Sequence, residues 1–450
     1  MSAPDLLPLL PEAAPETVCA IHRGRAITRR ELLAQVAALA TRLPAGRPLL
    51  NLCNDRYLFA IGLLAAISRG ATSLLPNATA PENIAALHAD WPELLCLSDD
   101  ADAPFGLPWL QVRTEALPVD APAPLPVIPA TQRVACVFTS GSTGRPQPHA
   151  KHFGPLFRNA RTGAQRLWQT AGGACAVLGT VPFQHMYGLE STVLLPLFGG
   201  GILCGERPFF PADVATALDA LPAPRLLVTT PFHLRTLLDA GLPMPKLGAL
   251  LSATAPLPAE LAIRAEQALA APMLEIYGST ETGQVATRAP AQETDWLPFA
   301  GIHLEQEGDF TFASGAHVEG RIALGDLIER LPDARFRLVG RHADMINIAG
   351  KRSSLAYLNH ILCAIPGVRD GAFCLPGNDA DALAPQRLAA FVVAPGMKAE
   401  AIRTALRQRV DAVFLPRPVV LLDALPRNAT GKLTATALAG LISAHIEDAG

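Results

Sequence analysis

The chain has 450 residues, of which 50% are hydrophobic and 17% are charged, and its formal net charge is −3. This length exceeds what one hydrophobic core normally organises, so we expect two or three domains. The slightly acidic balance excludes the basic surface that nucleic-acid binding requires, so nucleic acid is not expected as a partner.

Cysteine usage and the N-terminus both indicate a cytoplasmic protein. The eight cysteines stand mostly among apolar residues and form no C-x-x-C pair, which is typical of reduced thiols in a core. The N-terminal stretch MSAPDLLPLLPEAAPE has no basic segment and is broken by prolines, which argues against a signal peptide. The longest apolar run, Tyr57–Ile67, is too short to span a bilayer and predicts a buried helix.

The first three quarters of the chain alternate between strand and helix patterns. A turn at Arg23–Arg25 precedes Thr28 and Glu31, whose spacing is that of a capping box and predicts a helix after Thr28. Apolar strands are expected at Leu49–Cys53, Val134–Thr139, Ala176–Val181, Arg225–Thr229 and Ala249–Ser252. This alternation predicts an α/β fold of layered subdomains, in which the proline-rich Leu117–Pro129 is a surface connector.

A domain boundary is expected near Gly340–Asp344. Beyond it, we expect two helices and three strands, at Ser354–Ile365, Gly371–Leu375, Leu388–Val393, Lys398–Phe414 and Val419–Leu422. These elements suffice for a small α+β domain. The predicted organisation is therefore a large N-terminal domain, residues 1–340, and a small C-terminal domain, residues 341–450.

The stretch VFTSGSTGRPQPHAK, Val137 to Lys151, has the composition of a phosphate-binding loop. Its glycines permit close approach of the backbone, and its hydroxyls add donors to the backbone N–H groups. It is not a Walker A loop, because Pro146 and Gln147 stand where Gly and Lys are required. Taken alone, it could also be an ordinary Ser/Gly turn.

Three later segments carry comparable chemistry. Glu275–Thr282 (EIYGSTET) joins an aromatic ring, a Gly-Ser-Thr turn and a carboxylate, which suit a base, a phosphate and Mg²⁺ respectively. Ser252–Pro256 is a small-residue turn after a strand, and Leu425–Leu433 (LPRNATGKL) ends on a lysine. Each of these segments, taken alone, is more often a plain turn.

In this order, the segments resemble the adenylate-forming (AMP-binding) superfamily of acyl- and aryl-CoA synthetases, peptide-synthetase adenylation domains and luciferases. The resemblance runs from the Thr28 helix to Lys432, and it implies a small C-terminal domain that is mobile. It also implies that ATP and Mg²⁺ are used.

The resemblance implies a role for each matching position. The β- and γ-phosphates of ATP would bind to Thr139, Ser140, Gly141, Ser142, Thr143 and Gly144. Adenine would be enclosed by Ala253, Thr254, Ala255 and Pro256 and by the segment Glu275, Ile276, Tyr277, Gly278 and Ser279. The ribose hydroxyls would be held by Asp326 and Arg341. Thr280 would bind the α-phosphate and Glu281 the magnesium ion.

The resemblance further implies two residues at the reacting groups. His185, within Pro182–Gly188, would border the carboxylate and gate the thiol channel; a lone histidine near a strand end is otherwise usually structural. Lys432 would be the catalytic lysine of the small domain, because a cation that reaches both anions stabilises charge developing in the transfer. Its alternative is a solvated surface lysine.

The sequence departs from the family pattern at positions that usually carry charged residues. Gln147 stands where the phosphate loop usually ends in lysine, and Ala343 where the hinge usually has Asp or Lys. The chain is also shorter than most CoA synthetases. We hypothesise that the missing cation is supplied by Arg145 or, preferably, by Lys151.

The expected substrate is a small carboxylic acid with an uncharged aryl or acyl tail, because the segments expected to line its pocket (Phe183–Leu189, Thr229–Phe232 and Ser279–Val285) bring no cation. The short chain and the Pro146–His149 continuation resemble the 3-hydroxybenzoate:acyl-carrier-protein ligases of aryl-polyene and xanthomonadin-type pigment pathways, which implies a carrier protein as thiol acceptor. Two alternatives stay open: a medium-chain acyl- or aryl-CoA synthetase, and a non-catalytic nucleotide-sensing relative.

Overall fold

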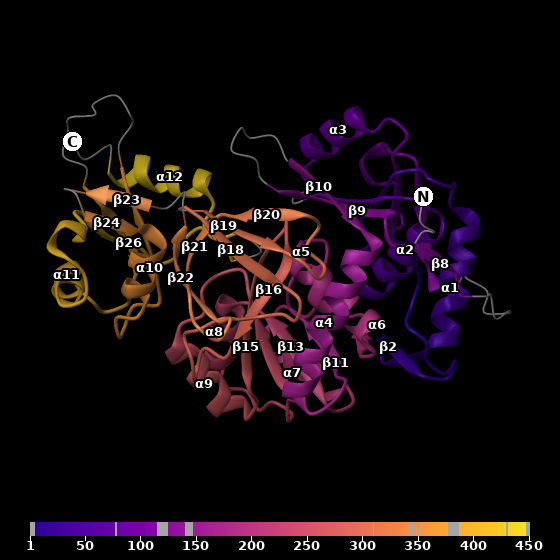
Figure 1. The fold of residues 1–450 in the computed structure, drawn as a ribbon, viewed down its shortest axis with the longest axis horizontal. Helices are drawn as coiled ribbons and strands as arrows, with labels where there is room; N and C mark the ends of the chain where they lie inside the picture. Colours follow the sequence, from indigo (N-terminus) through magenta and orange to yellow (C-terminus); the bar gives the residue numbers. More distant parts are fainter. Residues whose placement is uncertain are drawn as a thin grey trace.

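The computed structural model describes residues 5–76, 79–114, 125–139, 147–308, 310–341, 345–348, 351–376, 387–428 and 431–446. The chain forms a large N-terminal domain of mixed α/β structure and a small C-terminal domain, which lies to one side of it in orange and yellow (Figure 1). The predicted fold class is confirmed.

The large domain contains a nine-stranded sheet in the order β17-β16-β15-β14-β13-β11-β12-β2-β3. Its strands are β2 (Val18–His22), β3 (Arg25–Thr28), β11 (Ala176–Gly179), β12 (Ile202–Cys204), β13 (Arg225–Thr229), β14 (Ala249–Ser252), β15 (Met273–Ser279), β16 (Gly283–Arg288) and β17 (Leu297–Pro298). The run from β15 to β2 is parallel. The loops that follow β11, β13, β14 and β15 therefore emerge at one edge, which is where open α/β sheets bind ligands.

A second sheet has six strands in the order β10-β9-β5-β4-β6-β7. These are β4 (Leu49–Asn51), β5 (Ser73–Leu75), β6 (Leu95–Ser98), β7 (Trp109–Gln111), β9 (Arg133–Thr139) and β10 (Gln147–His152). Strands β9 and β10 are antiparallel, with Gln147 opposite Thr139 and Lys151 opposite Ala135. The predicted phosphate loop connects them, but Ser140–Gly144 lie outside the described residues.

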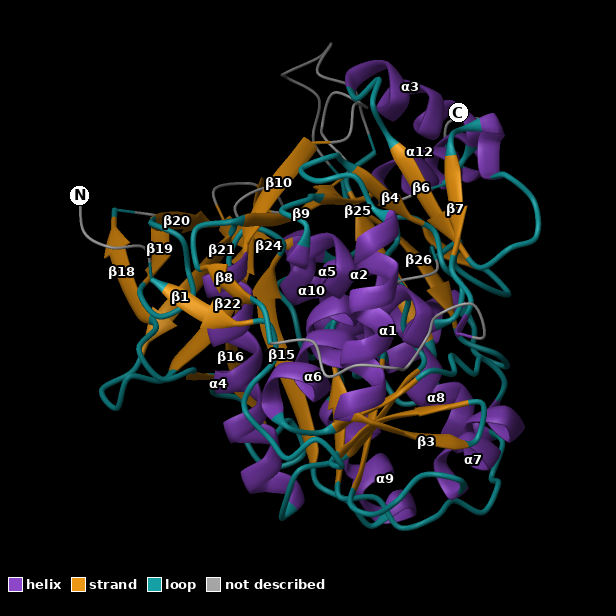
Figure 2. Cartoon of the chain, turned by 90° about the vertical axis from the view of Figure 1, so that its right-hand side faces the viewer, coloured by secondary structure: helices purple, strands orange, loops and turns teal. Residues whose placement is uncertain are grey.

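Helices pack between these two sheets. Figure 2 shows α1 (Arg29–Arg42), α2 (Arg56–Ser68) and α6 (Leu195–Gly199) together, with β4 and β6 above them and β3 below. Helix α1 begins after Thr28, whose hydroxyl accepts from the Glu31 N–H while the Glu31 carboxylate accepts from the Thr28 N–H, so the predicted capping box is present. Almost all of α2 is buried, as its apolar sequence predicts.

Further helices of the large domain are α3 (Pro81–Asp90), α4 (Phe153–Ala171), α5 (Met186–Gly188), a π-helical segment Leu189–Leu194, α7 (Pro211–Asp219), α8 (Pro231–Asp239) and α9 (Ala259–Leu269). Short antiparallel pairs complete it: β1 (Leu6–Pro8) with β8 (Val127–Pro129), β18 (His303–Glu307) with β19 (Phe310–Ser314) and β20 (Arg321–Leu324), and β21 (Asp326–Arg330) with β22 (Phe336–Arg341). No helix in the described part of the chain has both the length and the apolar character needed to cross a membrane.

The small domain has its own core around α10 and β26. Its elements are β23 (Met345–Ile348), β24 (Lys351–Ser354), α10 (Leu355–Cys363), β25 (Asp370–Cys374), β26 (Ala389–Val393), α11 (Ala399–Arg407), β27 (Val419–Leu421) and α12 (Ala435–His445). The helix predicted over Lys398–Phe414 is too long. It ends at Arg407, and Asp411 caps a separate 3₁₀ turn by accepting from the Val413 N–H.

Candidate functional site

Thr139, at the end of β9, is linked to Glu281, which follows β15. The Thr139 hydroxyl lies 2.9 Å from His149 Nε2, and this ring nitrogen lies 3.5 Å from Glu281 Oε1. Burial acts to raise the pKa of Glu281, but backbone and Ser279 hydrogen bonds and the charges of His149 and Lys151 lower it overall. Glu281 is partly exposed and stays ionised at neutral pH, so its carboxylate fits a divalent cation.

Lys151 lies beneath the same segment. Its side chain is 7% exposed, and Nζ donates to the backbone carbonyl of Glu281 at 3.2 Å. Burial lowers the Lys151 pKa, against the opposing charges of Glu190, Glu319 and Glu281. Lys151 is therefore buried and bonded to the Glu281 backbone. The hypothesis that it contacts phosphate stays a prediction, because Ser140–Gly144 are outside the described residues.

Glu190 is a buried acid whose charge acts on Lys151. It is 4% exposed, and Asn159 Nδ2 donates to its Oε1. Burial raises the Glu190 pKa, whereas the charge of Lys151 lowers it. Lys151 and Glu190 line the same small pocket, and among the described residues their interaction is electrostatic, without a close ion pair.

The residues predicted to face adenine and ribose form a connected group. The Tyr277 hydroxyl donates to Asp326 Oδ2 at 2.8 Å, and the backbone of Asp326 lies opposite that of Arg341 in the register of β21 and β22. The Tyr277 ring packs against Trp296 and Phe336, which fixes its position. The predicted aromatic and acid are thus neighbours.

Glu275 has an internal role. Its carboxylate is 3% exposed, pairs with Arg288 at 2.7 Å and accepts from the Leu257 N–H at 2.8 Å. It thereby ties the loop after β14 to β15. In that loop Thr254 has a left-handed φ of 79°, while Ala253 is buried and Pro256 exposed. Ile276 is buried, and Gly278 and Ser279 are exposed at the end of β15, followed by the half-buried Thr280.

His185 precedes α5, in the loop after β11. Burial, then the charge of Lys432, then that of Arg207 lower its pKa, which favours the neutral ring. In the same segment Phe183 is fully buried, and the Tyr187 hydroxyl donates to the carbonyls of Thr229 and Leu251. The segment is therefore fastened to the ends of β13 and β14.

Lys432 comes from the small domain, in a loop that Arg427 anchors. Arg427 donates to both Asp370 carboxylate oxygens at 2.7 Å and to the Gly431 carbonyl at 3.1 Å. A Cβ at Gly431 would lie 4.0 Å from Thr254 Oγ1. The Lys432 loop is thus docked against the loop after β14, and its charge reaches His185.

Sequence reasoning missed two residues around this edge, His149 and Arg207. His149 alternates with Gln147 and Lys151 along β10, so the three residues share one face of the strand, and that period of two was the available signal. Arg207 places a cation over the Phe183 ring, at 5.9 Å from its centroid, from a loop outside the segments expected to line the substrate pocket. Ala343 lies outside the described residues.

Known proteins share both the sequence and the fold. Residues 11–305 match the family described as AMP-binding enzyme, and residues 359–432 match the AMP-binding enzyme C-terminal domain. A 4-coumarate–CoA ligase of Rhodobacter capsulatus is 32% identical over 301 residues, covering 65% of this chain and 73% of that protein. A second, from Halorhodospira halophila, is 32% identical over 307 residues, covering 66% and 73%.

Solved structures show the same fold at lower identity. ATP-bound MatB from Rhodopseudomonas palustris superposes with a TM-score of 0.79 at 19% identity, covering 95% of this chain and 96% of that one. The o-succinylbenzoate CoA synthetase MenE from Bacillus subtilis, in complex with its acyl-adenylate, gives 0.78 at 19% identity, covering 94% and 95%. The chain therefore belongs to the AMP-binding family of ATP-dependent, adenylate-forming acid–thiol ligases.

Proposed function

We propose that this ligase activates an uncharged aryl acid of the hydroxybenzoic type as its acyl-adenylate and transfers the acyl group to the pantetheine thiol of an acyl carrier protein. The observation that carries the adenylation step is the docking of the Lys432 loop against the loop after β14, within electrostatic reach of His185. The acceptor and the hydroxybenzoate rest on the narrower resemblance in sequence. We also propose a domain boundary at residues 340/341 and a cytoplasmic location.

The assignment of roles follows the edge of the nine-stranded sheet. Thr139 and the loop Ser140–Gly144 hold the β- and γ-phosphates, and Thr280 holds the α-phosphate. The loop Ala253–Pro256 and the segment Glu275–Ser279 enclose adenine, with Asp326 and Arg341 at the ribose. Glu281 holds Mg²⁺, which, when bound, offsets the charge of the phosphates.

In the first half-reaction, a carboxylate oxygen of the acid attacks the α-phosphorus, and the bond to pyrophosphate breaks. Lys432 places a cation where both anions meet and so stabilises the charge that develops. Neutral His185 borders the carboxylate, where its ring can position the acid without trapping it in an ion pair. In the second half-reaction, the thiol replaces AMP on the acyl carbon and yields the thioester.

The decisive experiment is pyrophosphate exchange into ATP, screened over benzoic, 3- and 4-hydroxybenzoic, 4-coumaric and medium-chain fatty acids. We expect a hydroxybenzoate to give the fastest exchange. A fatty acid or coumarate as the best substrate would favour the acyl- or aryl-CoA synthetase alternative. No exchange with any acid would favour the nucleotide-sensing alternative.

A further inference from the structure

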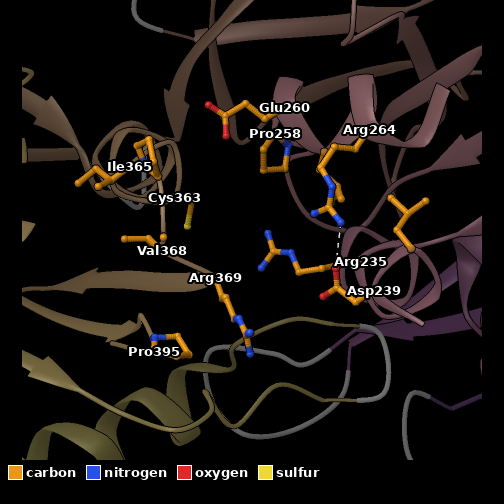
Figure 3. A pocket seen from close by; sticks show the side chains of 14 residues that line it. Arg235, Asp239, Pro258, Glu260, Arg264, Cys363, Ile365, Val368, Arg369 and Pro395 are labelled. Carbon is orange, nitrogen blue, oxygen red and sulfur yellow. Dashed lines mark hydrogen bonds and ion pairs between the residues drawn. The ribbon is translucent and has the colours of Figure 1, made fainter. Parts of the chain in front are cut away.

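A large cavity lies between the two domains and plays no part in the proposed reaction. Its volume is about 730 Å³, within the range of small-ligand sites. Helices α8 and α9 of the large domain form one wall, and the segment from Cys363 to Arg369, with Pro395, forms the other (Figure 3). We call it the arginine cavity, after Arg235, Arg264 and Arg369.

These three arginines come from both sides. Arg235 lies on α8 and Arg264 on α9, whereas Arg369 follows α10 in the small domain. Figure 3 shows the guanidinium groups of Arg235 and Arg369 directed into the space between the walls. Burial raises the pKa of the Cys363 thiol to about 11, and the positive charge of Arg235, on the other side of the cavity, acts to lower it.

Two acids, Asp239 and Glu260, also line the cavity and offset its positive charge only in part. Asp239 pairs with Arg264 at 2.9 Å, and Glu260 at the rim points its carboxylate away from the guanidinium groups. Among the described residues, the guanidinium groups of Arg235 and Arg369 have no hydrogen-bond or ion-pair partner. Like charges that face each other across an interface are unfavourable unless an anion lies between them.

We propose that the arginine cavity is a binding site for a phosphate-bearing ligand of nucleotide size. The planar, five-donor guanidinium group matches phosphate oxygens in geometry as well as charge. Arg235 and Arg264 hold the ligand from the large domain, and Arg369 holds it from the small domain. A ligand that bridges the two domains stabilises the observed domain arrangement, in which Lys432 lies at the large domain. It disfavours any arrangement that separates Arg369 from Arg235.

The test is calorimetric titration of the full chain with two probes, adenosine 3′,5′-bisphosphate and inorganic phosphate, in saturating AMP. AMP fills the adenylate site of the proposed function, and its own binding is measured first. Binding of both probes means that the cavity recognises phosphate itself, and binding of the bisphosphate alone means that it recognises a nucleotide phosphate; both support the site.

Variants locate the site. Arg235→Ala and Arg369→Ala should each raise the Kd for adenosine 3′,5′-bisphosphate by about tenfold or more. Each variant loses one charge-assisted contact to phosphate. Arg30→Ala and Arg403→Ala are the matched controls, one in each domain, because both arginines are paired at the surface outside the cavity. These controls should bind the probe as the wild type does.

Three outcomes overturn the proposal: no binding of either probe, equal binding by the cavity variants and the wild type, or weakening in Arg235→Ala alone, which removes the bridge. A failure of the proposed function is distinguishable, because it would appear as missing AMP binding and missing pyrophosphate exchange. Arg235→Ala and Arg369→Ala should change neither AMP binding nor pyrophosphate exchange.

Discussion

Lys432 is a residue whose effect should be confined to one half-reaction. Lys432→Ala should lower the rate of adenylate formation by about 10² to 10³, the usual cost of removing a group aimed at developing charge. Nucleotide binding should persist, because the proposed nucleotide contacts, apart from Arg341 at the domain boundary, belong to the large domain. Pyrophosphate exchange measures the first step, and thioester formation from preformed adenylate measures the second. Lys398→Ala is the control, and an equal loss in both steps would make the assigned role wrong.

His185 reports the position of Lys432 through its pKa. In the wild type this pKa lies below the ordinary value of 6.5, because burial and the charges of Lys432 and Arg207 disfavour the imidazolium. Removing one positive charge makes protonation easier, so Lys432→Met should raise the His185 pKa. An NMR titration of the ring protons measures the shift, with Lys398→Met as control. An unchanged pKa would show that the two side chains do not interact in solution.

Substitution of Lys151 distinguishes a structural role of this lysine from a role as the cation that the phosphate loop lacks at Gln147. If it anchors the Glu281 segment, Lys151→Met should lower the free energy of unfolding by about 1–3 kcal/mol, because the Glu281 carbonyl loses its hydrogen bond from Nζ. Thermal unfolding measures this loss, and the KM for ATP should then change little. If Lys151 instead serves the phosphates, Lys151→Met should mainly raise the KM for ATP, by about tenfold or more, and Gln147→Lys should recover it. We expect the first pattern.

At the scale of elements, the site depends on a loop that is held by side chains. Arg427 forms a bidentate pair with Asp370 on β25 and also supports the Gly431 carbonyl, next to Lys432. A lysine keeps the charge but not the two-pronged geometry. Asp370 is only partly buried, so the consequence for stability should be smaller than the consequence for positioning.

Arg427→Lys should therefore lower kcat for adenylate formation by about tenfold to a hundredfold, since small displacements of catalytic groups are costly. The KM for ATP should change little. Steady-state pyrophosphate exchange separates the two parameters, with Arg403→Lys on α11 as the matched control. A raised KM with unchanged kcat would mean that Arg427 supports nucleotide binding instead.

At the scale of the whole molecule, the acceptor thiol must reach the edge of the nine-stranded sheet, where both domains contribute residues to the proposed site. We predict faster thioester formation on a holo-carrier protein than on CoA at equal concentrations, because a carrier docks over a broad surface. The comparison needs the cognate hydroxybenzoate and mass-spectrometric detection of each thioester. Apo-carrier is the control, since it lacks the pantetheine thiol. Faster turnover with CoA would reject the prediction and favour a CoA ligase.

Local sequence patterns determined much of the fold. The capping box at Thr28 and Glu31 and the strands Arg225–Thr229 and Ala249–Ser252 are where the sequence predicts them. These features depend on residues within a few positions of one another. The Lys398 helix was overextended because its periodicity continues past Arg407, whereas a capping bond of Asp411 starts a new turn.

Motif order likewise determined the superfamily, and with it a set of site residues whose roles are proposals. What only the tertiary structure decided are relations between distant segments: the hydrogen bond of Lys151 to the Glu281 carbonyl, the ion pair of Arg427 with Asp370, the effect of the Lys432 charge on His185, and the position of Arg235 across the cavity from Arg369. No local pattern encodes such pairs. Parallel strands bring their carboxyl ends together from far apart in the chain, and burial then sets whether a charge meets water, a carbonyl or another charge.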